Sequence, residues 1–188
     1  MDQSTCKYGS VFNLEDYNSN DGMLTSVWGP SLWHSLHTIS FNYPIRPNRE
    51  DKDNYYRFYK QLVHVLPCRY CRENYKKNIQ DIKLNMKVME SRKTLSYWLY
   101  QVHERVNQML GKTSNLTYEQ VRDRYEMFRA RCLDTKRKKS RKTKKKPKRE
   151  KGCVNPLYGV KSKCIINIVP KNKKCKTFKI DKKCVLKR

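Results

Sequence analysis

The chain has 188 residues, which is enough for one domain and an appendage, and its formal net charge is +26. The charge is divided unevenly, because residues 1–135 carry 20 Lys or Arg against 15 Asp or Glu, whereas residues 136–188 carry 23 against 2. No run approaches the roughly 20 apolar residues that span a bilayer, and residues 1–17 lack a secretory signal pattern. We therefore expect no transmembrane segment and a cytoplasmic location.

Eight cysteines are unusual in that compartment, where thiols are normally kept reduced. Their number indicates metal binding, redox catalysis or the assembly of disulfides.

Residues 1–26 are polar with little apolar periodicity, and we interpret them as a flexible N-terminal arm. The first helix follows. Pro30 suits its first turn, Ser26 or Gly29 would lie near its cap, and the prolines of Tyr43–Pro47 end it.

Three more helices follow in order. One runs from about Asp53 to Leu66, where Pro67 ends it, and Cys68 begins the next towards Asn78. The clearest spans Leu95–Leu110, with apolar residues recurring at three and four and Gly111 as its C-terminal stop.

A short fifth helix is expected after a cap at Asn115 or Thr117, with Val121, Tyr125, Phe128 and Cys132 along it. No alternating β pattern occurs before residue 150. Helices joined by short loops predict an all-α five-helix bundle, with a four-helix core plus the short fifth helix, over residues 27–135.

The C-terminal extension divides into two parts. Residues 136–151 hold 12 Lys or Arg and one Glu, and mutual repulsion predicts an extended basic linker. Residues 152–188 form a small basic module in which β-branched residues favour short strands. Its cysteines are Cys153, Cys164, Cys175 and Cys184.

Cys68 and Cys71 are spaced Cys-x-x-Cys at a predicted helix start. The free amides and dipole of a helix N-terminus stabilise a thiolate, as would Arg69 and Arg72. The alternative is half of a zinc site, which needs two further ligands from the four histidines or the other cysteines. Spacing alone leaves redox chemistry and zinc equally supported.

Two pairs of residues flank this motif: Trp33 with His37, and His103 with Asn107. The members of each pair are four residues apart and so point the same way from their helix. Each side chain alone is explained as a core-edge residue that makes local hydrogen bonds. Together the pairs predict a slot with aromatic walls and polar groups, which suits a flat heteroaromatic cofactor.

Four segments, in order over residues 28–132, resemble the Erv/ALR family of FAD-linked sulfhydryl oxidases, particularly the short forms of large cytoplasmic DNA viruses. Trp28-Gly-Pro-Ser-Leu-Trp-His-Ser-Leu-His37 resembles the family's opening block, and Tyr43-Pro-Ile-Arg-Pro47 resembles its Tyr-Pro-x-Arg-Pro turn. Pro67-Cys-Arg-Tyr-Cys71 is similar to the active Cys-x-x-Cys. Trp98 to Lys112 resembles the Trp…His-Asn-x-Val-Asn…Leu-Gly-Lys block.

The resemblance implies a homodimeric five-helix bundle that holds FAD. Catalytic Cys68 would meet the thiols of protein substrates and Cys71 would lie against the isoalloxazine ring. Electrons would then pass through FAD to oxygen, giving hydrogen peroxide. If the protein is viral, its compartment would be the host cytoplasm and the virion. The implied FAD pocket comprises Gly29, Trp33, His37, Tyr43, His103, Asn107, Lys112 and Tyr125.

The sequence also departs from the family pattern. Glu104 stands where the family has the first Asn of its His-Asn pair, and Tyr125 stands where many members have Trp. The family's structural disulfide is incomplete: Cys132 would be its second half, but no Cys lies between Lys112 and Tyr125.

The basic extension has three interpretations: a solvated segment, a nucleic-acid contact through phosphates, or an anchor to acidic substrates or an anionic surface. Cys6 or the cysteines after Cys132 are candidates for an electron relay. A different class of protein remains open, a zinc-stabilised packaging protein that binds nucleic acid, with Cys68 and Cys71 among its ligands.

Overall fold

The computed structural model describes residue 15, residues 18–133 and residues 152–158. The predicted linker at 136–151 and the module beyond 158 lie outside the described residues, as do Cys6, Cys164, Cys175 and Cys184. The elements in chain order are α2 (Thr25–Asn42), α3 (Arg49–Val65), α4 (Arg69–Asp81), the 3-10 helix η2 (Val88–Glu90), α5 (Arg92–Met109), α6 (Tyr118–Glu126), β1 (Ala130–Leu133) and β2 (Gly152–Pro156).

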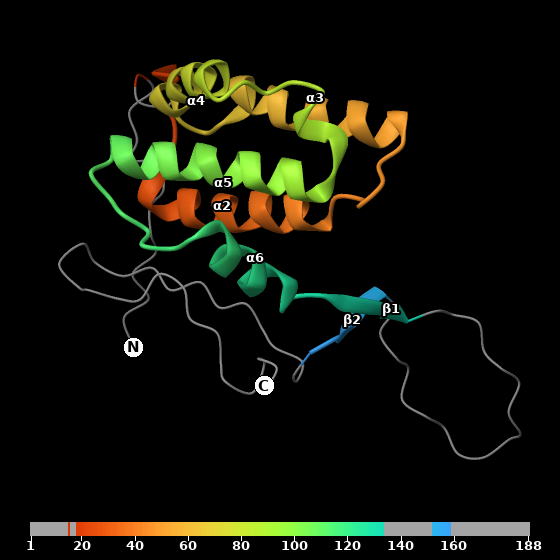
Figure 1. The fold of residues 1–188 in the computed structure, drawn as a ribbon. Coiled ribbons are helices and arrows are strands. Elements are labelled where there is room, and N and C mark those ends of the chain that lie inside the picture. Colours follow the sequence, from red (N-terminus) through yellow and green to blue (C-terminus); the bar gives the residue numbers. More distant parts are fainter. Residues whose placement is uncertain (1–14, 16–17, 134–151, 159–188) are drawn as a thin grey trace, which may run out of the picture.

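The helices form layers (Figure 1). Helices α3 and α4 lie together in one layer, α2 and α5 pack against each other in the next, and α6 covers the far side of α2 and α5. A single buried cluster fills the space between the first two layers, with members from every helix of both. Its buried residues are Leu36, Tyr43, Tyr59, Leu62, Leu66, Tyr75, Met89, Leu95, Trp98, Leu99 and Val102. The predicted all-α bundle is confirmed.

Side-chain caps set the starts of three helices. Asn48 with Asp51, Ser91 with Thr94, and Thr117 with Gln120 form reciprocal capping boxes at α3, α5 and α6. Each N-cap of this kind contributes about 1 kcal/mol to helix stability. The cap predicted at Thr117 is confirmed, and α3 begins about one turn before the expected Asp53.

The expected start of the first helix was wrong. Helix α2 begins at Thr25, and Pro30 lies inside it instead of in its first turn. Leu24, at the N-cap position, makes no side-chain cap. The start is instead set by a tertiary contact, since the N–H of Met23 donates to the carbonyl of Pro67 at 2.6 Å. Such a contact leaves no local signal in the sequence.

The end of the fifth helix was also wrong. Helix α6 ends at Glu126, and Cys132, which we expected on it, lies in β1. Strand β1 pairs antiparallel with β2, with Ala130 opposite Pro156 and an irregularity between Arg131 and Leu133. The partner strand is remote in the sequence, so the local pattern does not reveal the pairing.

Candidate active site

The two cysteines lie at the N-terminus of α4. Cys68 is the N-cap residue in an extended conformation, and its sulfur accepts a hydrogen bond from the N–H of Cys71 at 3.4 Å. Both side chains are partly buried and both are free thiols. The predicted placement of the pair at a helix start is therefore what the structure shows.

The two sulfurs differ in acidity. Burial raises the pKa of the Cys68 thiol, but hydrogen bonds from the Cys71 side chain and N–H, the Thr25 hydroxyl and the Tyr70 N–H outweigh it, so the pKa is lowered. Burial raises the pKa of Cys71 to about 11, and the hydrogen bond to Cys68 adds to this. Cys68 is thus the better thiolate and the better leaving group.

Thr25 is a site residue that sequence reasoning missed. Its hydroxyl lies 3.9 Å from the Cys71 sulfur, although 46 positions separate the two residues. The polar character and low apolar periodicity of residues 1–26 had placed Thr25 in the N-terminal arm. The available signal was its spacing of four from Gly29, in the first family-like block, which puts both residues on one face of a helix.

Further along α2, four of the predicted residues form an aromatic cluster. Trp33 stacks on His103 with ring centroids 4.0 Å apart and an interplanar angle of 6°. His37 Nε2 lies 3.0 Å from His103 Nδ1, and the His37 and Tyr125 rings are 5.3 Å apart. The structure therefore brings Trp33 and His37 of α2 together with His103 of α5 and Tyr125 of α6.

The imidazoles of His37 and His103 are neutral near pH 7. Burial lowers the pKa of His37 to about 3, with His103 and His34 as lesser causes. Burial also lowers the pKa of His103 to about 4, against the opposing effect of Glu104. The Nδ1 atom of His37 is buried without a hydrogen-bond partner. A buried polar atom of this kind fits a heteroaromatic ligand that offers a donor or acceptor.

The other predicted pocket residues are Gly29, Tyr43, Asn107 and Lys112. Gly29 is buried on α2. The Asn107 side chain donates from Nδ2 to Glu104 at 3.1 Å, and its backbone carbonyl accepts from the N–H of exposed Lys112 at 2.8 Å. Tyr43 is not in the cluster. Its fully buried hydroxyl donates to the carbonyl of Met89 at 2.8 Å, so its role in the structure is to hold the core together.

Two aromatic residues of the cluster were not predicted. His34 Nδ1 lies 3.4 Å from the Tyr125 hydroxyl, and the Phe41 and Tyr125 rings are 5.2 Å apart. Their spacing offered a signal, because His34, His37 and Phe41 recur at three and four residues on α2.

The thiol pair and the aromatic cluster lie at two points along α2. Thr25 beside Cys71 and His37 in the cluster are separated by twelve residues of one helix, which at roughly 1.5 Å of rise per residue is about 18 Å. The two positions also lie about 120° apart around the helix, so a ligand that contacts both must be elongated and curve around α2, as a dinucleotide can.

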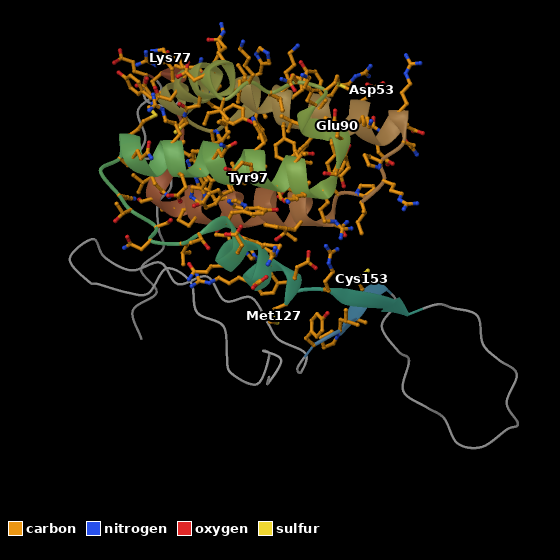
Figure 2. The ribbon with its side chains drawn as sticks, viewed as in Figure 1. Asp53, Lys77, Glu90, Tyr97, Met127 and Cys153 are labelled. Atoms are coloured by element: carbon orange, nitrogen blue, oxygen red, sulfur yellow. The ribbon has the colours of Figure 1, made fainter. Side chains whose placement is uncertain are left out.

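Other cysteine and metal chemistry is limited in the described part of the chain. Cys153 is disulfide-bonded and lies on β2, across the α2 and α5 layer from α4, which carries Cys71 (Figure 2). Within residues 15, 18–133 and 152–158, no three His, Cys, Asp or Glu side chains gather as a metal site. The same residues contain no helix suited to crossing a membrane.

The fold and site define a small helical protein with a redox-capable dithiol beside an aromatic–imidazole cluster. The model of the Erv1/Alr family matches residues 30–126, and the chain belongs to this family.

Named relatives agree. The chain is 37% identical over 99 residues to a probable FAD-linked sulfhydryl oxidase of Acanthamoeba polyphaga mimivirus, covering 53% of this chain and 68% of the relative. It is 32% identical over 84 residues to the mitochondrial FAD-linked sulfhydryl oxidase ERV1 of Saccharomyces cerevisiae, covering 45% of this chain and 43% of the relative. The crystal structure of the yeast Erv1 FAD-binding domain superposes with a TM-score of 0.50 at 27% identity, over 55% of this chain and 94% of that one.

Proposed function

We infer that the chain is an FAD-linked sulfhydryl oxidase, which forms disulfides in thiol substrates and passes the electrons to oxygen. The observation that carries this inference is the Cys68–Cys71 pair at the α4 N-terminus, beside α2, in a chain of the Erv1/Alr family. The zinc-protein alternative has no support from the relatives named above or from the described side chains.

We place the first attack at Cys68 because it is the less buried of the two sulfurs and so the easier one for a substrate to reach. In the oxidised pair, a substrate thiolate attacks the Cys68 sulfur, a mixed disulfide forms, and Cys71 is released as a thiolate. A second substrate thiolate then attacks the substrate sulfur of this mixed disulfide. The substrate disulfide forms, and Cys68 leaves as a thiolate. The lowered pKa of Cys68 favours this departure.

The residues that would hold FAD lie along α2 and on the helices that face α2. When bound, the flavin would accept two electrons and pass them to oxygen, which becomes hydrogen peroxide. The aromatic cluster of Trp33, His37, His103 and Tyr125 provides stacking surfaces and neutral imidazoles. Lys112, exposed after α5, would offer its ammonium group to a phosphate. Gly29 has no side chain beside Thr25. A Cβ added to Gly29 would lie 3.5 Å from Thr25 Cγ2.

Further assignments remain proposals. We propose a homodimer, supported by the exposed Phe58 and Val65 on α3, and light scattering of the purified chain tests it. We also propose a cytoplasmic site of action and binding of the basic segment to nucleic acid or another anionic surface. The run of 12 Lys or Arg at 136–151 supports the latter.

The oxidase function is tested by oxygen consumption with a small dithiol. The full chain should consume oxygen and produce hydrogen peroxide, and Cys68→Ser and Cys71→Ser should each abolish turnover while the protein keeps its fold and FAD. Turnover that survives either substitution would show that the pair is not the site.

A further inference from the structure

The segment Asn20–Met23 lies directly on the turn that carries Cys68. Gly22 forms an antiparallel β-bridge with Cys68. The N–H of Met23 donates to the Pro67 carbonyl at 2.6 Å, and the N–H of Arg69 donates to the Asp21 carbonyl at 3.0 Å. Two backbone hydrogen bonds therefore flank the catalytic cysteine on either side.

Glycine at position 22 permits the close approach of this segment to the backbone of Pro67 and Cys68. Its φ of +104° is a conformation that other residues rarely adopt. A Cβ at this position would collide with the Pro67 carbonyl oxygen and would lie 2.8 Å from the Cys68 Cα. Only glycine allows the two backbones to approach this closely.

The contact also divides the free amides at the start of α4. The Asp21 carbonyl takes the N–H of Arg69, which leaves the N–H groups of Tyr70 and Cys71 for the Cys68 sulfur. That arrangement needs Cys68 in its extended conformation, with φ −154° and ψ 129°. A β-bridge holds a residue in this region of backbone space.

We propose that Asn20–Met23 is a positioning element of the oxidase reaction, which holds Cys68 extended so that its sulfur faces the α4 amides and the incoming thiol. This inference rests on the proposed function, but it assigns a role to a segment outside the motifs that identify the family. The residues act through Cys68 and are not themselves reacting groups.

Among the described residues, three charged side chains lie near Cys68. Asp21 comes from the segment and forms an ion pair with Arg69 at 3.1 Å, while Arg72 on α4 donates to the Leu66 carbonyl at 2.8 Å and to the Asn20 carbonyl at 3.4 Å. Tyr70 and Cys71 are titratable neighbours on the same helix turn. Because Gly22→Ala changes none of these charges, any change in Cys68 acidity in that variant reports on position.

The test compares Gly22→Ala with Gly152→Ala in the full chain. Gly152 has a similar φ of +109° but nothing within 4 Å of an added Cβ, so it controls for backbone strain without the collision. Gly22→Ala should retain FAD and helical content, lower dithiol turnover by roughly tenfold, and move the pH midpoint for alkylation of Cys68 upward, as followed by mass spectrometry of its peptide. Gly152→Ala should match the wild type.

A second variant protects the test against misfolding. Met23→Pro replaces the N–H that donates to Pro67 with a ring carbon, so it breaks the same contact from a different residue, and the Met23 side chain is 69% exposed, so no core packing is lost. It should shift turnover and the Cys68 midpoint in the same directions as Gly22→Ala.

Wild-type turnover and midpoint in both Gly22→Ala and Met23→Pro would overturn the inference, as would equal losses in Gly22→Ala and Gly152→Ala. A wild-type protein without turnover would refute the proposed function instead, and the alkylation midpoints would still decide the role of the segment.

Discussion

At the residue scale, the two active-site thiols differ in pKa because they occupy different positions on one helix turn. Cys68, at the N-cap, receives backbone amides, whereas Cys71 is one turn inward and more buried. Cys68, the less buried and more acidic sulfur, suits exchange with substrate. Cys71, the more buried and less acidic sulfur, is the stronger nucleophile once it is deprotonated.

In Cys68→Ser, a thiolate remains only at Cys71, beside α2. This thiolate should give a broad long-wavelength absorption band with bound flavin, and the band should grow as pH rises because the thiolate is the deprotonated form. Its midpoint should lie below the value of about 11 for Cys71 in the dithiol, since the contribution of Cys68 to that raised pKa is lost. A band in Cys71→Ser instead would reverse the two roles.

The buried imidazoles predict a dependence of stability on pH. The folded pKa of His37, about 3, lies below the ordinary value of 6.5, so the unfolded chain takes up a proton first as pH falls. The free energy of unfolding should therefore fall as pH drops from about 6.5 towards 4, by up to about 1.4 kcal/mol per pH unit for this histidine. In His37→Gln, urea titrations should show a shallower dependence over this range, and an unchanged slope would contradict the assignment.

At the element scale, the sequence predicted the helix ends that are determined by residues close to them in the chain. Gly111, with its positive φ, follows the end of α5, and Cys68 begins α4, both as expected. The start of α2 and the strand β1 were missed, because each depends on a partner remote in the chain: Pro67 for the first and residues 152–156 for the second.

The candidate site shows the same division. Trp33, His37, His103 and Tyr125 were found because their family-like motifs are local patterns, and the structure brings them together. Thr25 and Gly22 were not found, since their contacts with Cys71 and Cys68 join segments that are 46 residues apart in the chain and leave no local pattern.

Helix α6 carries Tyr125 into the aromatic cluster and depends on its cap. Thr117→Ala removes the hydroxyl that accepts from the N–H of Gln120, which should lower the free energy of unfolding by about 1 kcal/mol and increase the loss of FAD on dilution. Thr117→Ser keeps the hydroxyl and should behave as the wild type in thermal melts and flavin release. Equal FAD loss in the two variants would show that the cap does not hold α6 in place.

At the scale of the whole molecule, we expect catalysis and charge to be separable, with the family match ending at residue 126 and the basic run beginning at 136. Truncation after Thr135 should leave turnover with a small dithiol close to that of the full chain. Turnover lost on this truncation but kept on truncation after Tyr158 would show that β2, which pairs with β1, belongs to the catalytic fold.

The same truncation tests the basic extension. Binding of the full chain to DNA, RNA or anionic vesicles should weaken steeply with added salt, because many lysines release counterions together, and it should drop sharply after truncation. Binding that is insensitive to salt, or retained after truncation, would contradict the proposed role. If tail cysteines relay electrons, truncation would instead spare small dithiols and impair oxidation of protein thiols.

The central claim is that Cys68 and Cys71 deliver electrons to a bound flavin, and the visible absorption spectrum of the purified full chain tests it most directly. The protein should be yellow, its flavin bands should bleach when a dithiol is added without oxygen, and they should return on exposure to air. Cys68→Ser and Cys71→Ser should stay yellow and resist bleaching by the dithiol. A folded, colourless protein that cannot take up added FAD would contradict the account.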